Sequence, residues 1–293
     1  MDNTLPPLKR IAAIHDLSGL GKCSLTVALP VISATGVECA CIPTAVLSTH
    51  TGEFTGWTFR DLSDDMLPIA RHWQREGVRI DGIYSGYLAS PEQAELLAQT
   101  IDCIAAPDTL VIVDPVMADN GALYAGFTPA FVQEMAKLCG KADIIVPNLT
   151  EACYLLNIPY PGEDYTRADI QHILTELGKL GCKQVVLTGV SLEPGRLGVM
   201  AYDTEKQTFF EYYNEKMPSS FHGTGDVFAS VVVGAMMRGC PLEDALRLAV
   251  DFTLESIRKT VADPEHRWYG VNFEEAIPLL VSRLSHEPHP SNH

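Results

Sequence analysis

Six short apolar segments, separated by helical patterns, constrain the fold of this chain more than any other feature of its sequence. They cover residues 10–15, 37–44, 80–87, 109–116, 142–148 and 183–189. Short runs that are apolar on both faces are typical of strands in a parallel sheet that helices cover on both sides. Residues 195–213 then alternate like an antiparallel hairpin, and three helical patterns follow them. The sequence therefore predicts an α/β fold with a central, mostly parallel sheet.

No linker-like stretch and no internal repeat divides the 293 residues. We therefore predict a single domain over residues 1–285. The last residues, 286–293, are rich in Pro and His, and we expect them to form a flexible tail.

The charge of the chain limits its partners. A net charge of −16 and a pI of about 4.9 argue against nucleic acid or an anionic membrane surface as the main partner. No apolar run reaches transmembrane length, and the N-terminal residues lack the apolar core of a signal peptide. The eight scattered cysteines include no C-x-x-C pair, which favours reduced thiols. We expect a cytoplasmic protein with neither a nucleic-acid nor a membrane partner.

Polar side chains follow the predicted strands. In open α/β sheets the ligand site lies beyond the carboxyl ends of the strands, so these side chains should meet on one rim. They include Asp16, Ser18, Thr44, Ser48, His50, Ser85, Tyr87, Asp114, Asp119, Asn148, Glu151 and Thr188.

The stretch "DLSGLGKCS", residues 16–24, nearly matches a phosphate-binding P-loop. That pattern requires a first glycine where this chain has Asp16, and a hydroxyl residue for Mg²⁺ where it has Cys23. A carboxylate at the loop mouth would also repel a phosphate. We therefore interpret this stretch as a loop over some other ligand.

The stretch "HGTGDVFAS", residues 222–230, carries the sharpest signal for chemistry. Gly223 and Gly225 flank Thr224 at the start of an apolar helix, where backbone N–H groups can point outward together and bind an anion. Asp226 lies in the first turn, where the helix dipole should keep it ionised, so that it can accept a proton from an attacking alcohol. The alternative is a helix start that Thr224 caps and that binds nothing.

Two further acids suit a metal ion. Asp114 ends a predicted buried strand, and Glu151 lies three residues after Asn148. Their oxygens are ligands that hydrated Mg²⁺ prefers, since it binds through few protein groups and substrate phosphates. The alternative is that Asp114 ends a strand and Glu151 caps a helix without binding anything.

His50 is read as a hydrogen-bonded loop residue, and Tyr87 either lines a flat ligand or packs.

Seven stretches, taken together, resemble the ribokinase-type family and, within it, the pyridoxal kinases. They run in family order from about Ile11 to Arg258 and comprise the first-strand glycine loop, "PTAVLSTHTG", "YSGYLASPEQ", "VDPVMADNGALY", "ADIIVPNLTEA", "VVLTG" and "GTGDVFAS". The resemblance implies a three-layer ribokinase-like domain that forms a homodimer. It also implies an enzyme of vitamin B6 salvage that uses ATP and Mg²⁺, often with K⁺ or Na⁺. Such enzymes phosphorylate the 5-hydroxymethyl group of pyridoxal, pyridoxamine and pyridoxine, and the product from pyridoxal is pyridoxal 5′-phosphate.

The resemblance also implies roles for individual residues. Asp226 matches the catalytic base, and Gly223, Thr224 and Gly225 match the anion hole that holds the transferred phosphate of ATP. The remaining matches are Asp114 and Glu151 around the metal and triphosphate, Thr188 in the nucleotide pocket, Thr44 and Tyr87 along the pyridine ring, Tyr124 on a nearby loop, and the Asp16 loop on the substrate side.

Two positions depart from the pyridoxal kinase pattern. Asp16 stands where these enzymes commonly have Ser, and Ala122 stands where many bacterial members have Cys. An anionic Asp16 near the ring nitrogen would favour a pyridinium, because opposite charge stabilises the charged form. We therefore expect Asp16 to alter the preferred B6 form.

Three alternatives remain open at this point. The D-x-S-G pattern at 16–19 is similar to that of hydroxymethylpyrimidine kinases of thiamine synthesis, although those enzymes typically carry Cys where this chain has Asp226. A sugar kinase is disfavoured because the chain lacks an N-terminal Gly-Gly signature. A non-catalytic B6- or nucleotide-binding relative is the third alternative, against which the intact G-T-G-D argues.

Overall fold

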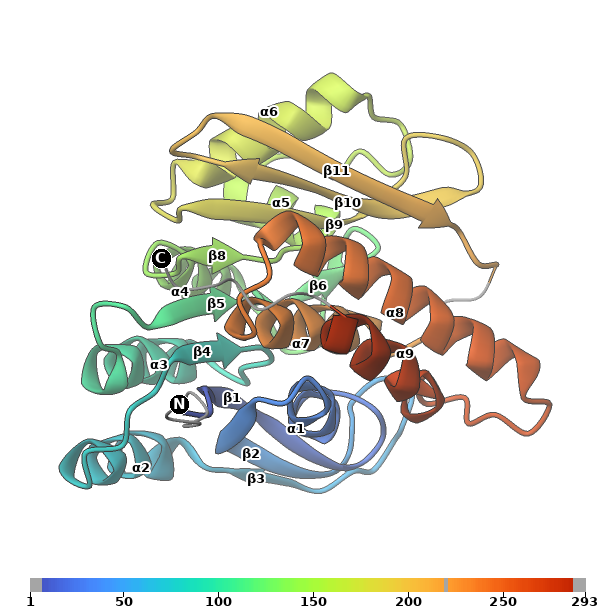
Figure 1. The fold of residues 1–293 in the computed structure, drawn as a ribbon. Coiled ribbons are helices and arrows are strands. Elements are labelled where there is room, and N and C mark those ends of the chain that lie inside the picture. The colour runs from blue at the N-terminus through green and yellow to red at the C-terminus, as the bar shows by residue number, and fades with distance from the viewer. Residues whose placement is uncertain (1–6, 219–220, 287–293) are drawn as a thin grey trace, which may run out of the picture.

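The computed structural model describes residues 7–218 and 221–286 and shows a central sheet between two layers of helices (Figure 1). In the described residues the sheet has nine strands, in the order β11-β10-β9-β8-β5-β4-β1-β2-β3. Their bounds are β1 Arg10–Leu20, β2 Glu38–Thr49, β3 Phe59–Asp61, β4 Gly82–Ser85, β5 Leu110–Val113, β8 Ile144–Ile145, β9 Gln184–Val190, β10 Arg196–Asp203 and β11 Thr208–Glu215. The six strands from β9 to β2 are parallel, whereas β10, β11 and β3 are antiparallel. The predicted sheet and hairpin are confirmed.

The helices divide between the two faces of this sheet. Their bounds are α1 Leu25–Ala34, α2 Ser63–Arg75, α3 Pro91–Ile104, α4 Pro129–Cys139, α5 Leu149–Leu156, α6 Arg167–Gly178, α7 Thr224–Met237, α8 Leu242–Ala262 and α9 Phe273–His286. Helices α2 to α6 pack on one face, and α1, α7, α8 and α9 pack on the other (Figure 1). Successive strand residues point to opposite faces, so Ile14 joins the first core while Ala13 joins the second. The three-layer architecture is thereby confirmed.

The first two strands are longer than the sequence indicated. β1 continues to Leu20 and pairs with β2 as far as Thr49, and the short strand β3 extends the sheet further. Asp16, which we expected in a loop after the first strand, therefore lies within β1, and Thr44, which we expected at the end of the second strand, lies within β2. The pairing shifts register between His15 and Leu17, so Asp16 lies at an irregularity of β1. Long-range ladder bonds satisfy the backbone of these polar residues, and no local pattern reveals such bonds.

A small hairpin stands apart from the main sheet. Its strands are β6 (Ala118–Asp119) and β7 (Ala122–Leu123). Asn120 and Gly121 join them with φ values of 51° and 81°, the left-handed conformation that tight hairpin turns require. Gly121 donates its N–H to the Thr150 hydroxyl at 3.0 Å, which fixes the hairpin over the start of α5.

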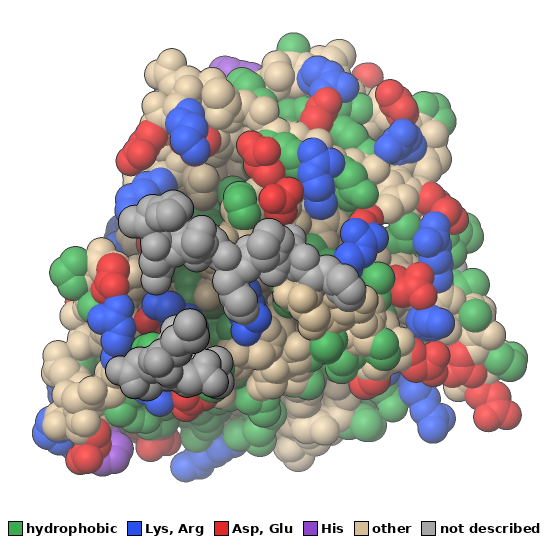
Figure 2. Space-filling model, in the orientation of Figure 1, with side chains coloured by type: hydrophobic (Ala, Val, Ile, Leu, Met, Phe, Trp, Pro, Cys, Tyr) green, Lys and Arg blue, Asp and Glu red, His purple; other side chains and the backbone are tan. Residues whose placement is uncertain are grey.

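On the surface, charges of both signs are interspersed over the face seen in Figure 2. In the part of the chain that the structure describes, no helix has the length and hydropathy to cross a membrane. The predicted tail lies outside the described residues, apart from His286, with which α9 ends.

Candidate active site

The start of α7 is an open anion-binding turn. Gly223 is its N-cap at φ 77°, and a Cβ added there would lie 1.7 Å from the carbonyl oxygen of Lys22, so the position requires glycine. A Cβ on Gly225 would meet nothing within 4 Å. No side chain caps this helix, since the Thr224 hydroxyl donates to the Phe221 carbonyl at 3.3 Å instead. The N–H groups of the first turn therefore remain available to an anion.

Asp226 lies in this turn, and its side chain is half-buried. Its Oδ2 accepts a hydrogen bond from the backbone N–H of Ser24 at 2.9 Å. Burial raises the pKa of Asp226 to about 7, and the charge of Asp16 adds to the rise. The expectation that the helix dipole keeps Asp226 firmly ionised is therefore wrong, because desolvation outweighs a dipole effect of about 1 kcal/mol. A pKa near neutrality suits a general base.

The lysine of the P-loop-like stretch, Lys22, makes its contacts within the chain. Lys22 extends its Nζ to Glu274 Oε2 at 2.8 Å and to Asn272 Oδ1 at 3.3 Å, both near the start of α9. Ser24 adopts a left-handed φ of 53° and contacts Asp226. Sequence reasoning missed this role of Ser24, because no local signal links residues so far apart in the chain.

Two other acids, Asp114 and Glu151, are buried, and the charges of Glu151 and Asp226 both act on Asp114. Asp114 follows β5 and is 7% exposed, and no hydrogen bond reaches its carboxylate from the described residues. Burial raises the pKa of Asp114 well above its usual range, and the charges of Glu151 and Asp226 raise it further. A buried carboxylate without a donor, beside two other acids, needs a proton or a cation.

Glu151 is tied to the backbone around it. Its two oxygens accept N–H groups from Met117 at 3.1 Å and Asn148 at 2.9 Å, and Asn148 caps α5 in return. Burial is nevertheless the largest influence and raises the pKa of Glu151 to about 8. The predicted helix cap is thus present, and the burial of the acid distinguishes it from an ordinary surface cap.

The acids do not form a complete metal cage. Among the described residues, no three His, Cys, Asp or Glu side chains form a set that could hold a metal ion. An oxygen-only pair such as Asp114 and Glu151 still suits Mg²⁺, which keeps several waters and binds substrate phosphates.

Three aromatic rings lie close together, and the charge of Asp16 acts on one of them, Tyr87. Tyr87 and Tyr124 lie with their ring centroids 5.7 Å and 6.4 Å from the ring of Phe127, a residue that the sequence did not single out. Burial, aided by the charge of Asp16, raises the pKa of Tyr87 to about 12. Asp16 itself is buried, and its Oδ2 accepts the Ser18 hydroxyl at 2.9 Å. Burial raises the pKa of Asp16 as well.

The two predicted threonines occupy different parts of this edge of the sheet. Thr44 is fully buried in β2, and its hydroxyl has no hydrogen-bond partner among the described residues. Thr188 in β9 lies opposite Asn148, and its N–H and hydroxyl both donate to the Pro147 carbonyl, at 2.9 Å and 3.4 Å. Thr188 is thus close to the start of α5, which Asn148 caps.

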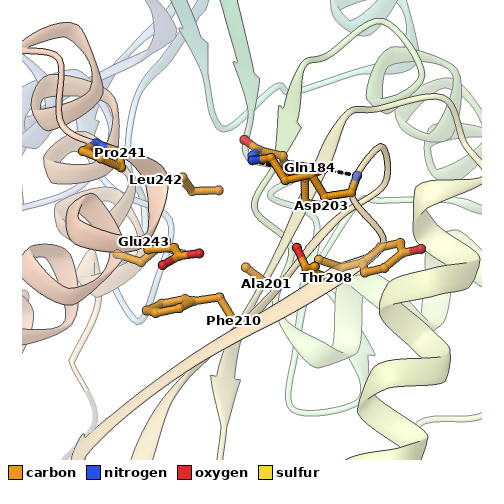
Figure 3. Close-up of a pocket in the computed structure, with 11 residues that line it drawn as sticks. Gln184, Ala201, Asp203, Thr208, Phe210, Pro241, Leu242 and Glu243 are labelled. Atoms are coloured by element: carbon orange, nitrogen blue, oxygen red, sulfur yellow. Dashed lines mark hydrogen bonds and ion pairs between the residues drawn. The ribbon is translucent and has the colours of Figure 1, made fainter.

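A separate pocket of about 140 Å³ lies between β9–β11 and the start of α8 (Figure 3). Phe210 and Glu243 line it, and Gln184 donates to Asp203 Oδ2 at 3.3 Å on its wall. Gln184 begins β9, so this pocket lies at the opposite end of the strand from Thr188. It is distinct from the edge of the sheet where the acids and aromatic rings gather.

The three-layer fold and the acid that follows the glycine turn at the start of α7 define a kinase of the ribokinase-like fold. The chain belongs to the phosphomethylpyrimidine kinase family, whose model matches residues 27–268. The predicted resemblance to pyridoxal kinases is confirmed by relatives that carry that name.

Relatives of the chain are similar to it over most of its length. A pyridoxine/pyridoxal/pyridoxamine kinase of Bordetella bronchiseptica is 27% identical and covers 85% of this chain and 89% of its own. A crystal structure of a putative phosphomethylpyrimidine kinase of Bacteroides thetaiotaomicron with pyridoxal is 40% identical, with a TM-score of 0.88 over 94% of this chain and 96% of that one. The pyridoxal kinase of Lactobacillus plantarum is 30% identical, with a TM-score of 0.87 over 97% and 100%.

Proposed function

We propose that this protein transfers a phosphoryl group from ATP to the 5-hydroxymethyl group of vitamin B6 forms. The observation that carries the proposal is Asp226, a half-buried carboxylate with a pKa of about 7 beside the uncapped amides of the 223–225 turn. The 40% identical relative whose structure contains pyridoxal supports a B6 substrate. Asp226, in the place where hydroxymethylpyrimidine kinases typically carry Cys, supports the same choice.

Different residues of the chain have different roles in the proposed reaction. Asp226 orients the acceptor hydroxyl and takes its proton, and the amides at 224–226 hold the charge of the transferred group. Tyr87, Tyr124 and Phe127 offer aromatic surface to a pyridine ring, with Thr44 and Asp16 at its polar edge. Thr188 lies on the nucleotide side.

Asp114 and Glu151 would hold the metal. Bound there, Mg²⁺ would neutralise phosphate charge and lower the cost of burying three acids together. A monovalent cation, K⁺ or Na⁺, is a further part of the proposal and rests on the family resemblance alone.

We also propose a homodimer in the cytoplasm. Leu17 on β1 and Val46 on β2 pair across the two strands and are 37% and 40% exposed. Leu20, at the end of β1, is 47% exposed. Exposed apolar side chains grouped in this way are typical of a surface that a second copy covers. Light scattering coupled to size exclusion tests the dimer, and a monomer at micromolar concentration would refute it.

A panel of four acceptors tests the proposed activity. Pyridoxal, pyridoxamine, pyridoxine and hydroxymethylpyrimidine are each incubated with ATP and Mg²⁺, and the products are followed by mass. The highest kcat/KM should fall on a B6 form. A higher kcat/KM on hydroxymethylpyrimidine would favour the thiamine alternative, and no product from any acceptor would favour a non-catalytic binding protein.

A further inference from the structure

The β6–β7 hairpin is too short to hold its own position. Its two strands pair only between Ala118 and Leu123 and between Asp119 and Ala122. An isolated two-stranded hairpin is marginally stable at best in water, so contacts with the rest of the chain fix this one. Tyr124, which we place against the pyridine ring, directly follows β7. The position of the Tyr124 ring therefore depends on what holds the hairpin.

Helix α5 holds the hairpin from the side of its first two turns. Asn148, the N-cap of α5, donates its side-chain amide to the Ala118 carbonyl at 2.8 Å. At the tip of the hairpin, the Thr150 hydroxyl accepts the N–H of Gly121 at 3.0 Å, and the Tyr154 hydroxyl donates to the Gly121 carbonyl at 3.4 Å. Both backbone groups of Gly121 are thus bound by side chains of α5.

A second segment, between α5 and α6, holds the same glycine through the ring of Tyr160. A Cβ added to Gly121 would lie 2.7 Å from Cδ1 and 3.3 Å from Cε1 of Tyr160, and the three atoms nearest to it all belong to that ring. The ring therefore fills the space that a side chain at position 121 would take, and it packs on the glycine itself. These contacts are made by ring carbon atoms, so they require the ring and not the hydroxyl of Tyr160.

The aromatic group at the site has a fixed part and a part that the hairpin carries. Phe127 stacks on the buried Phe131 of α4 with ring centroids 4.3 Å apart, and its ring lies 5.7 Å from that of Tyr87. Tyr124, whose ring is 6.4 Å from that of Phe127, is 42% exposed. The core therefore fixes Phe127, whereas the place of Tyr124 is set through the hairpin.

We propose that Tyr160 is a positioning residue for the B6 side of the site. Its ring, together with Thr150 and Tyr154, holds the tip of the hairpin at Gly121, and the hairpin in turn holds Tyr124 beside the pyridine ring. Tyr160 acts through the hairpin and is not itself part of the ring-binding surface. The inference rests on the proposed function, because it assigns a further residue to the same substrate site.

The test compares Tyr160→Ala with wild type in the binding and turnover of pyridoxal. The Kd for pyridoxal, measured by equilibrium dialysis, and the KM for pyridoxal should each rise about threefold to tenfold, the effect of losing one well-placed aromatic contact. The KM for ATP and kcat should change by less than about twofold, because only binding on the B6 side is weakened. A general loss of structure would instead lower kcat and affect both substrates.

Two matched variants serve as controls. Tyr160→Phe keeps the ring and should behave as wild type. Ile158→Ala shortens a side chain of the same segment that is 40% exposed, close to the 39% of Tyr160, and should also behave as wild type. An unchanged Kd in Tyr160→Ala would overturn the inference. So would an equal rise of the Kd in either control, or an equal rise of the KM for ATP in Tyr160→Ala.

A double-mutant cycle with Tyr124→Ala tests whether Tyr160 acts through Tyr124. Two residues that act through one contact give effects that do not add. In the Tyr124→Ala background, Tyr160→Ala should therefore change the Kd for pyridoxal by less than about 1.5-fold. The full threefold to tenfold effect in that background would overturn the inference.

A last readout needs neither substrate nor catalysis. Hydrogen exchange, followed by mass spectrometry on peptides that cover residues 117–125, should be at least about threefold faster in Tyr160→Ala than in wild type or Tyr160→Phe, because the hairpin opens more often. Unchanged exchange sinks the inference even if the enzyme is active. A wild type that phosphorylates none of the B6 forms refutes the proposed function, and the exchange rates then decide alone whether Tyr160 positions the hairpin.

Discussion

Asp226→Asn should make the protein more stable at alkaline pH while it removes most of the activity. The pKa of Asp226 rises from 3.8 to about 7 in the folded state because the surrounding protein removes part of the water around its carboxylate. A rise of about three units corresponds to about 4 kcal/mol of lost stability once the group is fully ionised. Asparagine carries no charge at this position and avoids that loss. Because it also cannot accept the proton, kcat should fall by orders of magnitude.

The pH dependence of this effect follows from the sign of the shift. A folded-state pKa above the unfolded one means that the folded protein binds the proton more tightly, so stability falls as pH rises from about 4 to 7. The gain from Asp226→Asn should therefore be near zero at pH 4, grow through neutrality and level off above pH 8. The gain is an upper estimate, because Asn must also keep the hydrogen bond from Ser24.

Urea unfolding followed by circular dichroism at several pH values measures this difference. The control Asp65→Asn, on the exposed side of α2, should change stability by less than about 0.5 kcal/mol at every pH. The reasoning is refuted if Asp226→Asn is less stable than wild type at pH 8.5, or if its gain is the same at pH 4 and pH 8.5.

Three further predictions concern the same site. Gly223→Ala should destabilise the fold by at least about 1–3 kcal/mol in thermal or urea unfolding, because Gly223 has a left-handed φ and an added Cβ would lie 1.7 Å from the Lys22 carbonyl oxygen. Gly225→Ala should not destabilise the fold, because an added Cβ there meets no atom within 4 Å. Equal losses of stability in the two variants would contradict this geometry. Asp16→Ser should change the ratio of kcat/KM values among pyridoxal, pyridoxamine and pyridoxine, and unchanged ratios would reject a specificity role. Wild-type kcat/KM, at saturating Mg²⁺, should fall about fivefold from pH 7 to pH 6 as Asp226 gains its proton, and a flat profile would exclude a base with that pKa.

The sequence was sufficient for the layers of the fold because the parallel strands are apolar on both faces. The runs at 109–116 and 183–189 could only be buried strands, and β5 and β9 lie there. The sequence did not predict where β1 and β2 end. Polar residues there remain in the strands because the long parallel pairing of β1 with β2, and the pairing of β2 with β3, provide hydrogen bonds for their backbone groups. Strand ends of this kind depend on partners distant in the chain.

The chemistry of the site was predictable to a similar extent. The spacing of Gly223 and Gly225 before an apolar helix predicted an anion-binding turn, because this spacing is visible in the local sequence. The raised pKa of Asp226 was not predictable, because the surroundings of its carboxylate depend on the loop that ends at Ser24. Phe127 was missed for the same reason, since its position beside Tyr87 is set by tertiary packing.

The central claim is that the 223–226 turn holds the transferred phosphate beside Asp226. A crystal structure with pyridoxal, Mg²⁺ and a non-hydrolysable ATP analogue tests it most directly. The account predicts the terminal phosphate at the amides of residues 224–226 and the 5-hydroxyl oxygen within hydrogen-bond distance of the Asp226 carboxylate. A terminal phosphate bound in the loop at residues 16–22, with Asp226 remote from the acceptor oxygen, would contradict it.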